Sequence, residues 1–326
     1  MNTRQLNLLN IGLMLFSTLV AFVLPFELFL FSYAVLGPLH YLTEISWLHK
    51  RNYFVKGKYD FIWLVVLGLF GTFGYFGMQG FNKWSEIAPY VALLSALGFY
   101  LIKDGYLRIL AVFIVIISAG FFNDSRFYIV FFLVFLPTII HVFLFTGSFI
   151  LHGAIKSKST TGKWSLVVFI ACAASFFLIV PDFSHYAVSD YIKKSYQDFS
   201  ALNFYIINYF QLDQLAKFDQ QAASTIFNSN TGFMVMRFIA FSYTYHYLNW
   251  FSKTSIIKWH QVEKKYLILT LIIWGIALVT YALDYQTGLK LLFFLSFLHV
   301  FLEFPLNFKT FIDIGKEIRI PGLSRS

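Results

Sequence analysis

Two histidine–glutamate pairs stand out in this apolar chain. The segment "PLHYLTE" contains His40 and Glu44, and "FLHVFLE" contains His299 and Glu303, with the acid four residues after the histidine in both. On an α-helix this spacing puts both side chains on one face, one turn apart. Imidazole nitrogens and carboxylate oxygens are ligands for iron, manganese or zinc. The spacing therefore predicts either a metal site or a histidine–carboxylate hydrogen bond.

The composition of the chain indicates a membrane protein. Of 326 residues, 58% are hydrophobic and only 13% are charged, and 42 residues are phenylalanine. Several stretches exceed the roughly 18 apolar residues that mark a membrane span. Cys172 is the single cysteine, which excludes an intramolecular disulfide, a thiolate metal cage and an iron–sulfur cluster. We expect an all-α polytopic transmembrane helix bundle that forms one membrane domain over residues 1–326.

Ten apolar segments predict ten membrane spans, the first of them retained because no signal-peptidase site follows it. The spans cover residues 5–24, 27–48, 61–82, 87–104, 107–123, 127–153, 164–182, 231–251, 266–283 and 288–311. Residues 183–230, between the seventh and eighth spans, are polar and aromatic. We expect them to form an extramembrane insertion of one or two helices on the bilayer surface.

The distribution of positive charge predicts the orientation of the chain. The formal net charge is +9, and ten spans place 18 of the 25 lysines and arginines on the side that holds both termini. Loops rich in lysine and arginine remain on the cytoplasmic side of a membrane. Both termini are therefore expected in the cytoplasm, in a multi-pass protein of the cytoplasmic (inner) membrane. The basic charge is then a topology signal, and no nucleic-acid partner is expected.

Four of the eight histidines are predicted to lie inside the bilayer at one depth. The other four are read as interfacial or solvated side chains: His49, His152, His185 and His260. The four internal ones lie about 11–15 residues into spans that all run from the outside to the cytoplasm, so their depths differ by only about 6 Å. This set consists of His40, His141, His246 and His299.

Buried ionisable groups need partners, which favours a shared cation. An unpaired ionisable group in hydrocarbon costs several kcal/mol. The predicted metal ligands are His40, Glu44, His141, His246, His299 and Glu303. The predicted metal is Fe2+, with another transition metal or haem left open. Residues expected to support the ligands are Asn249, Tyr245 and Thr138, with His152 and Arg237 as possible additions. The pattern assigns no catalytic residue.

The order of the histidine motifs resembles that of the Brp/Blh-type β-carotene dioxygenases, a membrane-embedded non-haem iron family. The similar segments are "GPLHYLTE", "PTIIHVFLF", "YTYHYLNWF" and "FLHVFLEF". The resemblance implies that the four internal histidines bind iron and that oxygen cleaves a long apolar polyene. This sequence departs from the family pattern in having glutamate for aspartate, Phe145 four residues after His141, and a single histidine in the third motif.

These observations favour a membrane-embedded oxidoreductase. We expect a non-haem iron oxygenase or hydroxylase that uses molecular oxygen on a lipophilic substrate, such as a carotenoid, an isoprenoid or a membrane lipid. A haem-binding electron-transfer protein is one alternative. A proton-coupled transporter or assembly factor with a histidine–glutamate relay is another. The chain has no GxxxxGK[ST] or GxGxxG motif, so chemistry driven directly by ATP is not expected.

Overall fold

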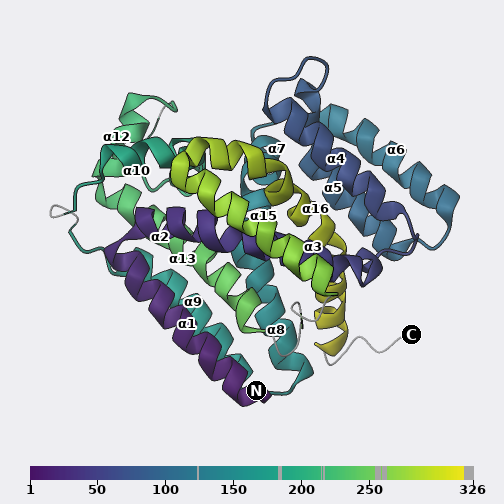
Figure 1. The fold of residues 1–326 in the computed structure, drawn as a ribbon, viewed down its shortest axis with the longest axis horizontal. Helices are drawn as coiled ribbons and strands as arrows, with labels where there is room; N and C mark the ends of the chain where they lie inside the picture. Colours follow the sequence, from purple (N-terminus) through teal and green to yellow (C-terminus); the bar gives the residue numbers. More distant parts are fainter. Residues whose placement is uncertain are drawn as a thin grey trace.

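The computed structural model shows a bundle of long helices (Figure 1). It describes residues 1–122, 125–182, 186–213, 215, 217–253, 258 and 263–318. Within these ranges the chain contains helices and no strand, so the prediction of an all-α fold is confirmed.

Long helices occur at all ten positions where the apolar pattern predicts them. Eight of the ten are single α-helices, and each of the other two is a continuous helix made of three consecutive elements. The elements are α1 (Thr3–Val23), α2 (Pro25–Phe31) with η1 (Ser32–Leu36) and α3 (Gly37–His49), α4 (Asp60–Tyr75), α5 (Asn82–Leu101), α6 (Gly105–Phe122), α7 (Arg126–Tyr128) with η3 (Ile129–Phe145) and α8 (Thr146–Lys156), α9 (Thr160–Leu178), α13 (Asn230–Ser252), α15 (Lys264–Leu283) and α16 (Tyr285–Glu317).

Seven of these helices are long and apolar enough to cross a membrane: α1, the α2–α3 helix, α6, the α7–α8 helix, α9, α15 and α16. The helix α4 is apolar but has only 16 residues. The helices α5 and α13 have sufficient length but lower apolarity. The composition of the seven helices indicates a multi-pass membrane protein.

The insertion between α9 and α13 packs against the bundle. The part of it that the structure describes contains three α-helices rather than the expected one or two: α10 (Asp190–Tyr196), α11 (Ser200–Tyr209) and α12 (Gln220–Asn228), with a short turn η4 (Gln197–Phe199). The Tyr196 ring meets Phe26 and Phe29 edge-on, with centroids 5.1 and 5.2 Å apart. In Figure 1, α10 and α12 lie toward the upper edge, whereas the N-terminus and the end of α16 lie toward the lower edge. Aromatic side chains explain this packing, because they bury large apolar areas against α2.

The core has two parts that meet at the predicted site. One part is built around Phe29 and Phe241, and the other lies between α4, α5 and α16 around Phe301. The residues that follow His141 contact both, because Val142 belongs to the first part and Phe145 to the second.

Prolines alter the helices that carry the predicted ligands. A proline lacks the backbone N–H, and its ring clashes with the carbonyl four residues earlier. Before Pro38 the helix widens into a π-helical stretch, Ser32–Leu36, in which the Gly37 N–H donates to the Ser32 carbonyl five residues back. Pro137 lies inside the longer π-helix η3. Wide turns of this kind are rare in proteins and occur often at functional sites.

The helix α16 carries two predicted ligands and begins with a defined cap. Asp284 accepts hydrogen bonds from the Thr287 hydroxyl at 2.6 Å and the Thr287 backbone N–H at 2.7 Å. These bonds favour the ionised carboxylate and hold the pKa of Asp284 below its ordinary value. The cap therefore stabilises α16 at neutral pH and weakens as the pH falls through this lowered pKa.

The close approach of α4 and α5 gives a prediction for stability. A Cβ atom on Gly74 would lie 2.3 Å from the Phe81 carbonyl oxygen and 2.8 Å from the Ser85 backbone nitrogen. Gly74→Ala is expected to destabilise the fold by about 1–3 kcal/mol, because backbone atoms must move to make room. Gly120→Ala is the control, since nothing lies within 4 Å of a Cβ there. Thermal unfolding in detergent measures both variants, and equal midpoints would contradict the packing described.

Candidate metal centre

Four histidines from four separate helices converge in the interior. They are His40 on α3, His141 on η3, His246 on α13 and His299 on α16. One ring nitrogen from each lies within 4.8 Å of the other three, and all four side chains are buried. The prediction that these four histidines lie together is therefore confirmed, and this cluster could bind a metal ion.

The four imidazole rings are arranged in a closed square, in which each ring packs against two of the others. Going round it, the centroid distances are 4.7 Å for His40–His246, 4.8 Å for His246–His141, 5.0 Å for His141–His299 and 5.4 Å for His299–His40. The Nε2 atoms of His40 and His246 are 3.0 Å apart, and those of His141 and His299 are 3.1 Å apart. The cluster therefore contains two close Nε2–Nε2 pairs.

Two of the four histidines also contact a side-chain oxygen through their Nδ1 atoms. Nδ1 of His246 lies 2.8 Å from Oγ1 of Thr146, and Nδ1 of His141 lies 2.9 Å from Oε2 of Glu303. The His141–Glu303 contact is close but not aligned as a hydrogen bond. A partner at Nδ1 leaves Nε2 available as the ligand atom, an arrangement common for metal-bound histidines.

Glu44 brings a carboxyl group to the same cluster. Its Oε2 atom lies 3.1 Å from Nε2 of His40, and its side chain is 3% exposed. That oxygen has no hydrogen-bond partner. Among the described residues, the partners within 4 Å of Glu44 and Glu303 are histidines, and neither acid forms an ion pair with lysine or arginine.

This arrangement brings imidazole nitrogens and a carboxyl oxygen into close contact. Two imidazole nitrogens at 3.0 Å attract only if a proton or a cation lies between them. Neutral imidazoles can hydrogen-bond to each other in both pairs, because each neutral ring carries one N–H and one acceptor nitrogen. A metal cation satisfies both nitrogen pairs and the carboxylate together, and buried charges in proteins are paired or coordinate metals. The donor set of imidazole and carboxylate suits iron, manganese or zinc.

The glutamates are positioned differently from each other. Glu44 contacts His40 on its own helix, at the i, i+4 spacing that the sequence suggests. Glu303 contacts His141 on η3 rather than His299 one turn away on its own helix. The sequence places phenylalanine four residues after His141, and the structure supplies the acid for this histidine from α16.

The three residues predicted to support the ligands differ in the contacts that their side chains make. The Thr138 hydroxyl donates to the Val134 carbonyl and lines a cavity beside the cluster. Tyr245 donates to Asn10 at 3.2 Å, so its hydroxyl points to α1. Oδ1 of Asn249 is buried without a hydrogen-bond partner.

The two possible additional residues lie away from the four rings. His152 is on α8, with Nε2 4.0 Å from the carboxylate of Asp313. Arg237 is buried with its guanidinium carbon 5.6 Å from the centroid of Phe22 and 5.9 Å from that of Phe233. His185 and His260 lie outside the described residues.

Sequence reasoning did not identify Thr146, although it contacts His246. Thr146 follows His141 by five residues, which on an α-helix, at about 100° per residue, puts it about 140° away around the axis. The π-helix η3 ends at Phe145, and π-helical bonding from residue i to i+5 brings such residues onto one face. Thr43 was also not identified; its hydroxyl accepts a 3.0 Å hydrogen bond from the indole of Trp250, which packs on His40.

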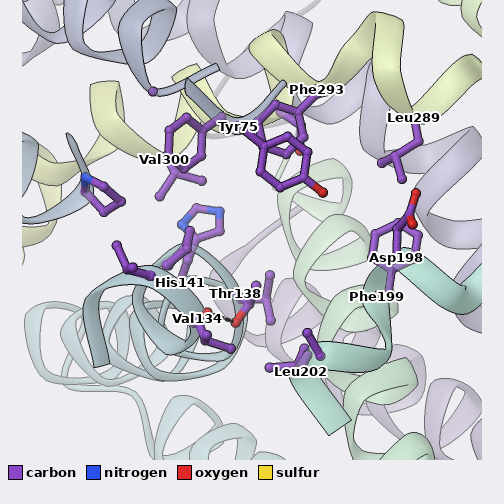
Figure 2. Close-up of a pocket in the computed structure, with 18 of the residues that line it drawn as sticks. Tyr75, Val134, Thr138, His141, Asp198, Phe199, Leu202, Leu289, Phe293 and Val300 are labelled. Atoms are coloured by element: carbon purple, nitrogen blue, oxygen red, sulfur yellow. Dashed lines mark hydrogen bonds between the residues drawn. The ribbon is translucent and has the colours of Figure 1, made fainter. Parts of the chain in front are cut away.

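A cavity of about 390 Å³ leads to the histidine cluster (Figure 2). His141 and His299 form its inner end, and Tyr75, Glu86 and Asp198 lie at its outer end. Figure 2 shows Tyr75 and Phe293 on one side of the space and Phe199 and Leu202 on the other. Apolar side chains form most of the wall between the two ends: Leu133, Val134, Pro137, Val142, Leu289 and Val300. The volume suits a small-molecule site.

Comparison of the chain with protein-family models, curated proteins and solved structures finds no match. The function therefore has to be argued from the histidine cluster and the cavity that reaches it.

The geometry predicts graded effects on metal binding. His299→Ala removes one of the four nitrogen atoms, so stoichiometric metal is expected to be lost. Glu303→Gln keeps the ligand set but weakens the hold on His141, so metal affinity is expected to fall about 10–100-fold. Metal content and competition with a chelator measure both effects in purified protein.

Glu317→Gln is the matched control, because Glu317 is an exposed acid on the same helix. It should bind metal as the wild type does. Equal metal content in wild type and His299→Ala would show that the cluster is not the binding site.

Proposed function

We propose that this protein is a membrane-embedded non-haem metal oxygenase or hydroxylase acting on a lipophilic substrate. The observation that carries the proposal is the cavity that ends on His141 and His299, two members of the four-histidine cluster. An apolar cavity beside a potential metal site is suited to bring an apolar molecule to the ion. Iron is the metal proposed, held by the four histidines with Glu44 as a fifth ligand.

The spacing of the cluster favours one ion with five or six ligands. At a metal–nitrogen distance of about 2.1 Å, adjacent ligands at right angles are about 3.0 Å apart and tetrahedral ligands about 3.4 Å. The two observed Nε2–Nε2 separations are 3.0 and 3.1 Å. Ligands on opposite sides of one ion would be about 4.2 Å apart. The largest separation among the four nitrogen atoms, 4.8 Å, would therefore contract by about 0.6 Å around a single ion.

The same compactness disfavours haem at this cluster. A haem bound through two histidines needs a planar slot between their rings. Here each ring is the neighbour of two others, and the neighbouring centroids are at most 5.4 Å apart. Such packing leaves no slot for a porphyrin.

A bound metal would supply a site for dioxygen and for electron transfer to it. The chain itself binds and orients the ion and keeps the surrounding space apolar. Glu44 and Glu303 offset the ion's charge, so the centre becomes less costly to bury. Cleavage of one carbon–carbon double bond by O2 yields two carbonyl groups and balances without a reductant. Hydroxylation inserts one oxygen atom of O2 into the substrate and releases the other as water, which consumes two electrons and two protons. Unlike cleavage, hydroxylation therefore requires an external electron donor.

The resemblance to Brp/Blh-type β-carotene dioxygenases supports the oxygen-dependent class of reaction. Carotenoids and other isoprenoids are therefore among the proposed substrates, together with membrane lipids. The proposal also includes ten membrane spans in the cytoplasmic membrane, with both termini and the lysine-rich loops in the cytoplasm.

The proposed orientation predicts which loops are accessible from outside. Cys172 is buried, so a Cys172→Ser background gives a chain for single-cysteine labelling. Met78→Cys, in the exposed turn after α4, should react with a membrane-impermeant maleimide in intact cells. Ser157→Cys, in the exposed turn after α8, should react only after the membrane is permeabilised. The reverse pattern would refute the orientation.

An oxygenase centre predicts a ligand position open to a diatomic gas. Nitric oxide serves as a probe that is independent of the substrate. Iron-loaded wild type should bind it and give the electron paramagnetic resonance signal of a high-spin non-haem iron nitrosyl, with no Soret absorption band. The Glu317→Gln control should give the same signal, and His299→Ala should lose it.

A Soret band in the purified protein would favour the haem-binding alternative. A protein without bound metal, even after exposure to iron, would contradict the oxygenase proposal and favour the proton-coupled alternative.

A further inference from the structure

The outer end of the cavity differs chemically from its walls. Glu86 at the start of α5 and Asp198 in η4 are both exposed and both line the cavity. Among the described residues, no lysine or arginine lines it. The two carboxylates give the entrance a negative charge that lies apart from the buried Glu44 and Glu303. This charge attracts a cationic group and repels a carboxylate or a phosphate.

Aromatic rings surround the same entrance. The rings of Tyr75 and Phe293 are stacked with their centroids 4.2 Å apart and an interplanar angle of 11°. Across the cavity, Phe199 meets Tyr33 edge-on at 4.7 Å. Aromatic faces bind organic cations, and quaternary ammonium groups are recognised in proteins by cages of such rings. Aromatic rings and carboxylates together therefore select for the same head group.

The inner part of the cavity can accept a chain but not a second charge. From Leu289 near the entrance to His299 at the inner end, α16 advances about 15 Å. A linear chain of about 12 carbon atoms spans this length, at roughly 1.25 Å for each bond of an extended chain. The wall between the entrance and the histidines is mostly apolar, so this part of the cavity suits the tail and the charged head group stays at the entrance.

We infer that the cavity binds a single-chain amphiphile with a cationic amine or ammonium head group, which stays at the Glu86–Asp198 entrance while the tail reaches the histidine cluster. The assignment of the tail end as the reacting part rests on the proposed oxygenase function. Recognition of the head group does not, because it depends only on the entrance.

Three probes with the same tail test this inference: tetradecyltrimethylammonium, tetradecanol and tetradecanoate. Their binding is measured on full-length protein in a neutral glycoside detergent. The wild type should bind the ammonium compound about tenfold more tightly than the carboxylate, with the alcohol between them. The double variant Glu86→Gln/Asp198→Asn should lose this preference.

Asp190→Asn is the matched control, because Asp190 is an exposed acid on the same insertion but does not line the cavity. It should keep the preference. Tetradecanoate binding as tightly as the ammonium compound, or an unchanged preference in the double variant, would overturn the inference.

His299→Ala separates this inference from the proposed function. The variant should lose metal but keep the preference for the ammonium head group. If no sample contains metal and the preference persists, the oxygenase proposal fails and the head-group assignment stands. If the wild type contains metal and shows no preference for the ammonium head group, the head-group assignment fails and the oxygenase proposal stands.

Discussion

The rest of the site depends on the electrostatics of buried electron-pair donors. Four imidazoles lie together in the buried interior, and the Glu44 carboxyl group contacts one of them, His40. In a medium of low dielectric constant such groups repel one another or stay unsatisfied unless something positive lies among them. Hydrogen bonds between neutral tautomers can satisfy the histidine pairs, whereas the Glu44 oxygen needs a proton of its own or a cation. A shared metal ion satisfies the whole set.

Two of the four helices that carry the histidines depart from regular α-helical geometry close to the cluster. Each ligand helix must bring its histidine inward while avoiding collisions between bulky neighbours. Pro38 and Pro137 lie within four residues of a cluster histidine, and both are accompanied by π-helical geometry. Widening η3 brings Thr146 toward His246 while His141 faces His299. The second layer of contacts around the rings thus follows from proline positions as well as from the histidines.

Much of this could be predicted from the sequence. Continuous apolar stretches located the ten long helices described above, and counting residues from the span ends placed His40, His141, His246 and His299 close together. Those inferences work because helix rise and bilayer thickness are fixed lengths. The choice of partner for Glu303 could not be predicted, since the contact with His141 depends on how α16 and η3 pack. Thr146 could not be found either, because a 3.6-residue period turns it away from the site.

The insertion between α9 and α13 shows a second limit of sequence reasoning. Its polar, aromatic composition indicated a segment at the membrane surface, but composition does not tell which helices it covers. In the structure it supplies Asp198, Phe199 and Leu202 to the wall of the cavity. A segment that seemed peripheral in sequence therefore belongs to the path toward the histidines, and it contributes charge to the entrance of that path.

The most direct test of a shared cation is X-ray absorption spectroscopy at the metal edge of purified protein. We predict a first shell of nitrogen and oxygen atoms at about 2.0–2.2 Å with outer-shell scattering from several imidazoles. A first shell that contains sulfur or a porphyrin, or the absence of metal absorption in protein exposed to iron, would contradict a metal ion shared by the four histidines.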